Sequence, residues 1–265
     1  MPSDNYAQNP SRDPNYSRHL VDILAFARAR LGFKPDPGQA RALDPSVSRG
    51  LLNCCRQWGK STTVSVLAVH RAVHDPGSLT VVASPSARQS AEFVRKVSGF
   101  LRLLDIPLRT DGNNSISRVL PNGSRIVGLP GCESTTRGFS NVALLLIDEA
   151  SRVSDDLYHA VRPMIAANAD ACIWLMSTPN GRQGFFYDEW QNGGPEWTRV
   201  EAPATQCPRI RPEFLEAERC HMPDQKFRQE YLCEFTAADH AYFDPDAIDA
   251  AFRFQPDGPT EIAQD

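Results

Sequence analysis

Two kinds of hydrophobic pattern alternate along the chain. Uninterrupted apolar runs such as VALLLID and ACIWLMS are followed by longer stretches in which apolar residues recur every three or four positions. The runs are typical of strands buried on both faces, and the longer stretches are typical of amphipathic helices. We therefore expect an α/β fold with a doubly wound, mainly parallel sheet flanked by helices. The expected strands are 50–55, 78–84, 142–148 and 171–177, and the expected helices are 60–73, 86–104 and 155–165.

Two segments depart from this alternation. The runs ISRVL and SRIVGL flank the turn sequence Pro-Asn-Gly, which predicts one hairpin between Ser115 and Leu129. Before the core, apolar residues at helical spacing in 16–33 predict a lid-like helix, and the sequence PDPGQ at 35–39 then breaks the chain. The sheet should thus carry an inserted hairpin and be preceded by a small helical lid region.

Beyond residue 182 the hydrophobic pattern loosens. Short helices are expected at 211–220 and 224–235, and the two ends of the chain are polar and contain prolines. We divide the chain into a flexible N-terminal tail, one domain that includes the lid elements, and a linker or disordered C-terminal end; their bounds are 1–17, 18–250 and 251–265.

Composition excludes some functions and leaves others open. A formal charge of −4 and a pI near 5.9 exclude a uniformly basic nucleic-acid coat but permit a local basic patch. No segment approaches the roughly 20 apolar residues that span a bilayer, and the first residues form no apolar signal core. These observations predict a soluble, intracellular protein without a membrane partner.

The seven cysteines predict reduced, buried thiols. Their number is odd and several lie in apolar runs such as LLNCC, which argues against a disulfide framework. Cys207, Cys220, His221 and Cys233 allow an alternative interpretation as a metal site, but they lack the close C-x-x-C pairs of zinc modules.

The stretch CCRQWGKSTT, residues 54–63, resembles a phosphate-binding loop. It joins an expected strand to an expected helix, and it places Gly59, Lys60 and Ser61 where the G-x-x-x-x-G-K-[ST] pattern has them, with Cys54 in place of the first glycine. Gly59 would allow close backbone approach, Lys60 could reach the outer phosphates, and Ser61 could offer its hydroxyl to Mg²⁺. The alternative is an ordinary helix N-terminus.

A second motif supports nucleotide hydrolysis. The apolar run ALLLIDEAS ends in Asp148 and Glu149, as a Walker B strand does. Asp148 could hold Mg²⁺, and Glu149 could orient and deprotonate the attacking water. The alternative is a strand that ends in two solvated acids.

A third motif follows the next expected strand. IWLMSTPNGR ends the strand at Ser177, Thr178 and Pro179, beside the Walker B strand and at the same edge of the sheet. Hydroxyls at this place could sense the γ-phosphate, whereas the alternative is an ordinary strand-end turn.

Four segments together resemble the ATPase domain of bacteriophage large terminase subunits, the DNA-packaging motors of tailed phages. They are CRQWGKST, TTRGFSNVALLLIDEAS, STPNGRQGFFYDEW and RQEYLCEF, and the resemblance covers roughly residues 18–250. It implies an ASCE, RecA-like P-loop NTPase fold, and it accounts for Cys54, because the Walker A loop of this family is commonly deviant. The implied nucleotide-binding residues are Gln39, Arg56, Gln57, Trp58, Gly59, Lys60, Ser61 and Thr62.

The resemblance also assigns particular roles. It implies that Gln39 contacts adenine, unless this residue simply lies on a helix surface, and that Ser177, Thr178 and Pro179 form the coupling motif. Arg56 would approach the γ-phosphate or the lid, with a structural salt bridge as the alternative. Arg137 would act in trans on the nucleotide of a neighbouring subunit, where such an arginine is worth about 10³ to 10⁵ in rate.

The implied function is hydrolysis of ATP with Mg²⁺ to translocate double-stranded DNA into a procapsid. The implied partners are the portal protein of the procapsid, the small terminase subunit, and further copies of the chain in a ring, with a monomer in isolation. The implied location is the host cell cytoplasm. Arg125, Arg182 and Arg199 are weak candidates for contacts to duplex phosphates.

A large terminase normally continues into a nuclease domain. The late acids Asp239, Asp244, Asp246 and Asp249 lie in a segment without a strand run that could carry a nuclease sheet, so we expect no nuclease activity from this chain. Two other functions stay open: a DNA translocase similar to superfamily 2 helicases, and a nucleotide-binding regulatory or scaffold protein with negligible turnover.

Overall fold

The computed structural model describes residues 22–112, 114–129, 131 and 138–236. Four predictions lie outside these residues: the tail at 1–17, the C-terminal end at 251–265, the trans-acting role of Arg137, and the late acids, which are Asp239, Asp244, Asp246 and Asp249.

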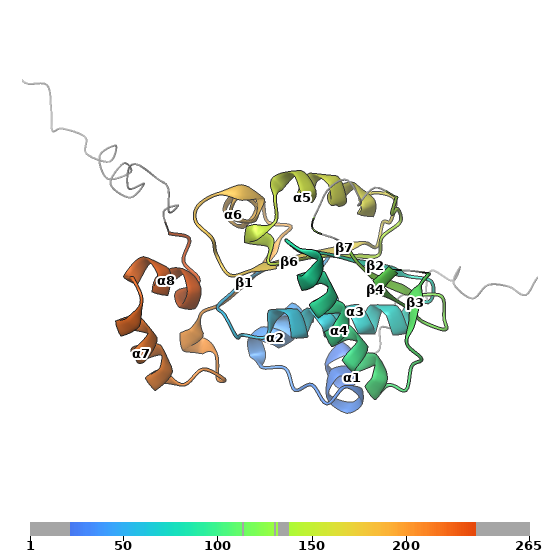
Figure 1. Ribbon diagram of the computed structural model, residues 1–265, viewed down its shortest axis with the longest axis horizontal. Coiled ribbons are helices and arrows are strands. Elements are labelled where there is room, and N and C mark those ends of the chain that lie inside the picture. The colour runs from blue at the N-terminus through green and yellow to red at the C-terminus, as the bar shows by residue number, and fades with distance from the viewer. Residues whose placement is uncertain (1–21, 113, 130, 132–137, 237–265) are drawn as a thin grey trace, which may run out of the picture.

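An eight-stranded sheet crosses the centre of the molecule in the order β3-β4-β5-β2-β6-β7-β1-β8 (Figure 1). From β5 to β8 every neighbouring pair is parallel, whereas β3–β4 and β4–β5 are antiparallel. The doubly wound, mainly parallel sheet and its hairpin are thereby confirmed. The strands are β1 Arg49–Cys54, β2 Leu79–Ala83, β3 Arg109–Asp111, β4 Asn114–Val119, β5 Arg125–Gly128, β6 Leu144–Asp148, β7 Cys172–Ser177 and β8 Thr198–Ala202.

The central strands are buried on both faces. In β6, Leu144 and Leu146 belong to one hydrophobic core, and Leu145 and Ile147 belong to the other. Because side chains alternate between the two faces of a strand, a strand with a core on each side must be apolar at nearly every position. This explains the uninterrupted apolar runs of the sequence.

Helices cover both faces of the sheet (Figure 1). On one face lie α1 Ile23–Arg30, α2 Pro37–Ala42, α3 Lys60–His74 and α4 Ala87–Leu103; on the other lie α5 Asp155–Val161 and α6 Gly184–Asn192. After β8 the chain forms a pair of short helices at the side of the sheet, α7 Pro212–His221 and α8 Asp224–Leu232. None of the helices in the described part of the chain is long and apolar enough to cross a bilayer.

The N-terminal helix lies against the core. The Phe26 ring of α1 contacts His70 and His74 of α3 edge-on, with ring centroids 5.3 and 5.0 Å apart. α1 therefore packs on α3 as part of the helical layer on that face of the sheet, and does not form a lid. The helices that contact or face the phosphate loop are instead α2, through Gln39, and α7 and α8, which line a hollow together with Arg56 and Gln57.

The hydrophobic pattern does not predict four of the α-helices and strands, which are β3, β8, α2 and α6. β8 is an edge strand in which Val200 and Ala202 are buried and the other residues are more exposed, so it has no apolar run. α2 spans six residues and is held by a capping box in which Asp36 and Gln39 each accept the other's backbone N–H. The sequence PDPGQ is thus not only a break in the chain, because Asp-Pro followed by Gln also starts a helix.

Gly50 provides a test of the packing between β1 and β7. It pairs with Trp174, and a Cβ at residue 50 would overlap the indole ring of that buried tryptophan. We expect Gly50→Ala to lower the free energy of unfolding by about 1 to 3 kcal/mol, as overpacked cores do. Gly99→Ala is the control, because a Cβ there meets nothing and alanine favours the helix by up to about 1 kcal/mol. Urea or thermal unfolding of both variants measures this, and a Gly50→Ala protein as stable as the parent would contradict it.

Candidate nucleotide-binding site

Three strand ends meet at one edge of the sheet. Asn53 of β1 lies beside Ser177 of β7, and Asp148 of β6 lies beside Met176 of β7. β7 therefore separates the strand of the phosphate loop from the Walker B strand, and the residues that follow it can reach both. The expected adjacency of the Walker B strand and the Ser177 strand is confirmed.

The phosphate loop has a fixed shape before α3 begins. Gln57 and Gly59 have positive φ angles of 63° and 93°. A side chain at Gly59 would be strained by that φ and would also lie 3.1 Å from the amide nitrogen of Gln39. The Trp58 side chain is 2% exposed and points into the hydrophobic core. Trp58 thereby anchors the centre of the loop in the core, and the loop leads directly into the N-terminus of α3.

Lys60 lies at the junction of the three strand ends. Its ammonium nitrogen is 3.2 Å from a carboxylate oxygen of Glu149 and 3.2 Å from the hydroxyl of Thr178. The Thr178 hydroxyl in turn donates to the Cys54 carbonyl at 3.0 Å. With a residue exposure of 8%, Lys60 is nearly buried; the carboxylate after β6 balances its charge, and the hydroxyl after β7 accepts a hydrogen bond from it.

Ser61 and Asp148 offer oxygen atoms for a divalent cation. The Ser61 hydroxyl donates to Asp148 at 3.3 Å, and burial, with a contribution from Glu149, raises the pKa of Asp148 to about 6. No group of three or more His, Cys, Asp or Glu side chains that could hold a metal occurs within the described ranges. A hydroxyl and one carboxylate fit Mg²⁺, which usually completes its shell with waters and substrate phosphates.

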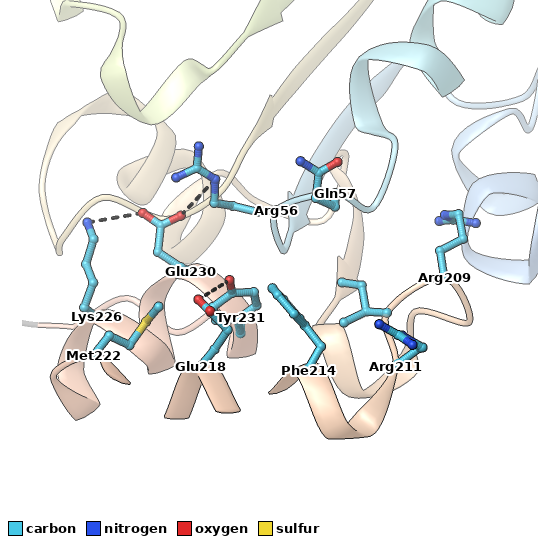
Figure 2. A pocket seen from close by; sticks show the side chains of 11 residues that line it. Arg56, Gln57, Arg209, Arg211, Phe214, Glu218, Met222, Lys226, Glu230 and Tyr231 are labelled. Carbon is cyan, nitrogen blue, oxygen red and sulfur yellow. Dashed lines mark hydrogen bonds and ion pairs between the residues drawn. The ribbon is translucent and has the colours of Figure 1, made fainter. Parts of the chain in front are cut away.

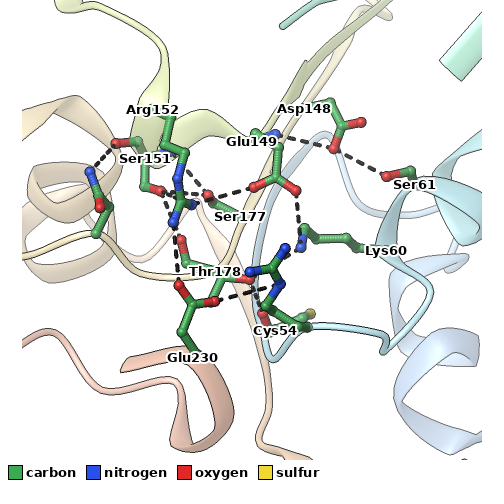
Figure 3. A network of polar contacts seen from close by, with 12 residues as sticks. Cys54, Lys60, Ser61, Asp148, Glu149, Ser151, Arg152, Ser177, Thr178 and Glu230 are labelled. Carbon is green, nitrogen blue, oxygen red and sulfur yellow. Dashed lines mark hydrogen bonds and ion pairs between the residues drawn. The ribbon is translucent and has the colours of Figure 1, made fainter. Parts of the chain in front are cut away.

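Glu149 has a constrained backbone. Its φ and ψ are 54° and 44°, a left-handed conformation, and its N–H donates to Asp148 at 3.1 Å. The carboxylate is thereby turned toward Lys60 and toward Arg152, whose guanidinium lies 3.6 Å away (Figure 3). A left-handed non-glycine residue is uncommon, and such strain often accompanies a functional position.

Ser177 and Thr178 are tied to the Walker B loop. The Ser151 hydroxyl lies 2.7 Å from the Ser177 hydroxyl and donates to the Thr178 carbonyl at 2.7 Å (Figure 3). Pro179 is buried next to them. The segment after β7 thus contacts the phosphate loop through one hydroxyl and the Walker B loop through another.

A polar hollow of about 410 Å³ lies over the loop. The residues that line it include Gly59, Ser61 and Thr62 at the start of α3. Its charged lining residues are four cations and two carboxylates: Arg56, Lys60, Lys96, Arg152, Glu149 and Glu230. A helix N-terminus combined with excess positive charge suits a polyphosphate.

Comparison with known proteins decides the family. A family model described as "Terminase large subunit, T4likevirus-type, N-terminal" matches residues 51–249, which is most of the chain. The chain belongs to the large terminase family. The match includes the phosphate loop, the Walker B strand and the segment after β7, and it confirms the resemblance that these motifs carry.

Individual relatives agree with this assignment. The large terminase subunit of Thermus virus P23-45 is 26% identical over 249 residues, covering 80% of this terminase chain and 51% of the relative. The solved ATPase domain of the Thermus phage P74-26 large terminase has a TM-score of 0.72 at 22% identity, over 82% of this chain and 100% of that one. The large terminase of a thermophilic bacteriophage, solved in complex with ADP, has a TM-score of 0.65 at 10% identity, over 75% and 53%.

The two solved structures show that the fold is that of terminase ATPase domains. The terminase chain spans about half the length of the curated relatives that it matches.

Not every predicted site residue lies in the hollow. Gln57 does, but Trp58 does not line it, because its indole packs in the hydrophobic core. Gln39 is 3% exposed; its amide donates to the Trp58 carbonyl at 3.1 Å and accepts from the Asp36 N–H. Gln39 therefore supports the backbone of the phosphate loop from its buried side. Its contact with adenine stays a prediction.

Arg56 faces outward at the rim. Its side chain is 66% exposed and lies 3.8 Å from the carboxylate of Glu230.

Arg152 and Glu230 are site residues that the sequence motifs do not predict. Glu230 is part of the segment RQEYLCEF, but no motif rule assigns a role to an acid at that place.

A second hollow of about 740 Å³ adjoins the first, and the two share Arg56, Gln57 and Glu230. Figure 2 shows the side chains of Phe214 from α7 and Tyr231 from α8 on its wall. Their rings meet edge-on with centroids 6.2 Å apart. Phe214 is one of two large hydrophobic side chains that are exposed in the described segments, so an aromatic face is open beside the phosphate loop.

The weak candidates for DNA contact all have partners within the chain, and their contact with DNA stays a prediction. Arg199 donates to four backbone carbonyls, including that of Trp190 at 2.7 Å. Arg125 pairs with Asp111, and Arg182 donates to the Phe235 carbonyl at 3.0 Å. Charge alone does not separate arginines that bind backbone from arginines that are available to a ligand.

The thiols agree with the reduced form. Those described are free, and those at 54, 55, 207 and 233 are buried. Burial raises the pKa of Cys55 to about 12. Cys207, Cys220, His221 and Cys233 all lie in the described part of the chain, where no group of three or more such side chains is arranged to hold a metal ion.

Proposed function

We propose that the terminase chain binds MgATP over the phosphate loop and hydrolyses it. The observation that carries this proposal is the convergence of Lys60, the Ser61–Asp148 pair and Glu149 at one sheet edge. Lys60 would contact the β- and γ-phosphates, and Ser61 and Asp148 would hold the cation, which supplies neutralisation of phosphate charge. Glu149 would accept the proton of the attacking water.

The ion pair between Lys60 and Glu149 explains how the base could be released. In the structure each group balances the other at 3.2 Å. When the γ-phosphate takes over Lys60, the Glu149 carboxylate loses its strongest partner and becomes available to a water molecule. Thr178 accepts a hydrogen bond from Lys60, so a movement of Lys60 toward the γ-phosphate would also shift Thr178 and the end of β7 that precedes it.

The neighbouring hollow is suited to the base of the nucleotide. It shares the lining residues Arg56 and Gln57 with the phosphate hollow, and it presents the exposed Phe214 ring and the apolar side chains of Ile210 and Met222. Nucleobases stack on aromatic rings, with a typical contribution of about 1 to 3 kcal/mol. We therefore propose that the phosphates lie over α3 and the base between the loop and α7. This replaces the adenine contact that the resemblance implies for Gln39, which does not line that hollow.

The proposed use of this energy is translocation of double-stranded DNA into a procapsid. Family membership supports this step, and the proposed partners are the portal, the small terminase subunit and further copies of the chain in a ring in the host cytoplasm. Measurement of DNA-stimulated ATP turnover, with and without procapsids, tests it. Equal turnover in all conditions would favour the regulatory or scaffold alternative, and stimulation by DNA but not by procapsids would favour a helicase-like translocase.

Lys60 and Glu149 should separate binding from hydrolysis. We expect Lys60→Ala to abolish turnover because the charge on the outer phosphates is lost, and Glu149→Gln to bind ATP but hydrolyse it at least about a hundredfold more slowly. Equilibrium binding and turnover assays on both proteins measure this. A Glu149→Gln protein that hydrolyses ATP at the parent rate would refute the Walker B assignment.

Phe214 should contribute to binding of the base of ATP and not to binding of its phosphates. We expect Phe214→Ala to raise the KM for ATP about fivefold to 150-fold, and to leave the affinity for inorganic tripolyphosphate unchanged, since only the base loses a partner. Leu103→Ala is the matched control, because Leu103 is the other exposed large hydrophobic residue in the described chain and does not line either hollow. Unchanged ATP binding in Phe214→Ala would exclude the second hollow as the base site.

Arg137 should act between subunits. We expect Arg137→Ala to bind ATP normally and to hydrolyse it slowly, while the parent chain gains specific activity as its concentration rises. A mixture of Arg137→Ala and Glu149→Gln should recover part of the activity, because one interface then joins an intact pocket to an intact arginine. An arginine acting in cis would give no recovery at any mixing ratio.

A further inference from the structure

Glu230 of α8 is a buried carboxylate at the boundary between the helical pair and the site. Its residue exposure is 5%, and three cations surround it: Lys226 at 3.2 Å, Arg152 at 3.5 Å and Arg56 at 3.8 Å (Figures 2 and 3). Its backbone carbonyl also accepts the Arg56 N–H at 3.2 Å. A single side chain thus joins α8 to the phosphate loop and to the residues after the Walker B strand.

Two of these cations also face the phosphate hollow. Arg56 precedes the loop glycine, and Arg152 follows Glu149 by three residues and contacts its carboxylate at 3.6 Å. Both guanidinium groups lie at ion-pair distances from Glu230 that exceed ordinary hydrogen-bond lengths. The Glu230 carboxylate therefore orients the two guanidinium groups without holding them in tight hydrogen bonds. A more highly charged anion, such as a phosphate, could bind both groups in its place.

Glu230 itself opposes the ligand. It is one of two carboxylates on the wall of a hollow that we propose to hold a triphosphate, and like charges a few ångströms apart repel even at a high effective dielectric constant. Lys226, one turn earlier on α8, can continue to balance Glu230 after the arginines turn toward the phosphate. The buried carboxylate is then never left without a cation.

We propose that Glu230 is a positioning residue for ATP hydrolysis: it holds Arg56 and Arg152 at the rim of the phosphate hollow so that both can transfer to the terminal phosphate. This inference rests on the proposed function and goes beyond it by naming the group that places the two arginines. Because Glu230 lies on α8, the contacts of this helix would change when ATP binds. A carboxylate that positions arginines in this way weakens binding of ATP and accelerates its hydrolysis.

The isosteric variant Glu230→Gln tests this combination. We expect the affinity for ATPγS to rise about threefold or more, since one like charge is removed, and kcat for ATP to fall about tenfold or more, since the arginines are no longer oriented. Thermal unfolding of the same protein reports any loss of packing between α8 and the core. Glu230→Asp keeps the charge with a shorter reach, and should keep the parent affinity while recovering part of kcat.

Glu234→Gln is the matched control. Glu234 lies just after α8, pairs with Arg228, and lines neither hollow. Its loss removes one negative charge from the same segment without changing the arginines at the site, so both ATPγS affinity and kcat should stay within about twofold of the parent, as for an exposed ion pair.

A combined variant distinguishes positioning from simple anchoring. If Glu230 acts through Arg56 and Arg152, then adding Glu230→Gln to a protein that already carries Arg56→Gln and Arg152→Gln should not slow turnover further. Independent, multiplicative losses of kcat would overturn the proposal. So would a Glu230→Gln protein with weaker ATPγS binding, a lower melting temperature and a normal kcat, because that result describes a residue that only holds α8 in place. Absence of turnover in the parent chain would instead contradict the proposed function.

Discussion

The buried ammonium group of Lys60 organises the edge of the sheet. A nearly buried cation needs partners, and here they come from three strands: the Glu149 carboxylate after β6, the Thr178 hydroxyl after β7 and, through Thr178, the Cys54 carbonyl of β1. These partners fix the spacing of the strand ends, and with it the distance between the phosphate loop and the Walker B acids. The strand order β6-β7-β1 makes this possible, because β7 lies between the two motifs and can contact both.

The parts of the fold that are buried on both faces could be predicted from the sequence. Strands such as β6 and β7 must be apolar throughout, so their pattern is visible without a structure. β8 could not be predicted because an edge strand buries only alternate residues, and α2 escaped because its signal is a capping box and not a periodic pattern. The expected helix at 155–165 is wrong at its end: α5 stops at Val161 and continues as a 3-10 turn, since Pro163 has no N–H to donate.

The site shows the same limits. Lys60, Ser61, Asp148 and Thr178 could be found because each occupies a defined place in a motif, and the structure brings them together. Trp58 belongs to the same motif, yet its side chain packs in the core, which depends on the residues below the loop. Arg152 and Glu230 meet only because α8 folds back onto the loop. Contacts between segments so distant in the chain depend on topology, and a single sequence carries no direct signal for them.

The anchoring of Trp58 has a consequence for the departure at Cys54. A glycine is required where the backbone must be left-handed, and in this loop those positions are Gln57 and Gly59, whereas Cys54 ends a regular strand. The buried indole and the support of Gln39 order the loop through contacts within the chain, so little conformational entropy remains to be lost when phosphate binds. The loop is thus pre-organised by aromatic packing, and this mechanism tolerates a bulky residue where more flexible loops use glycine.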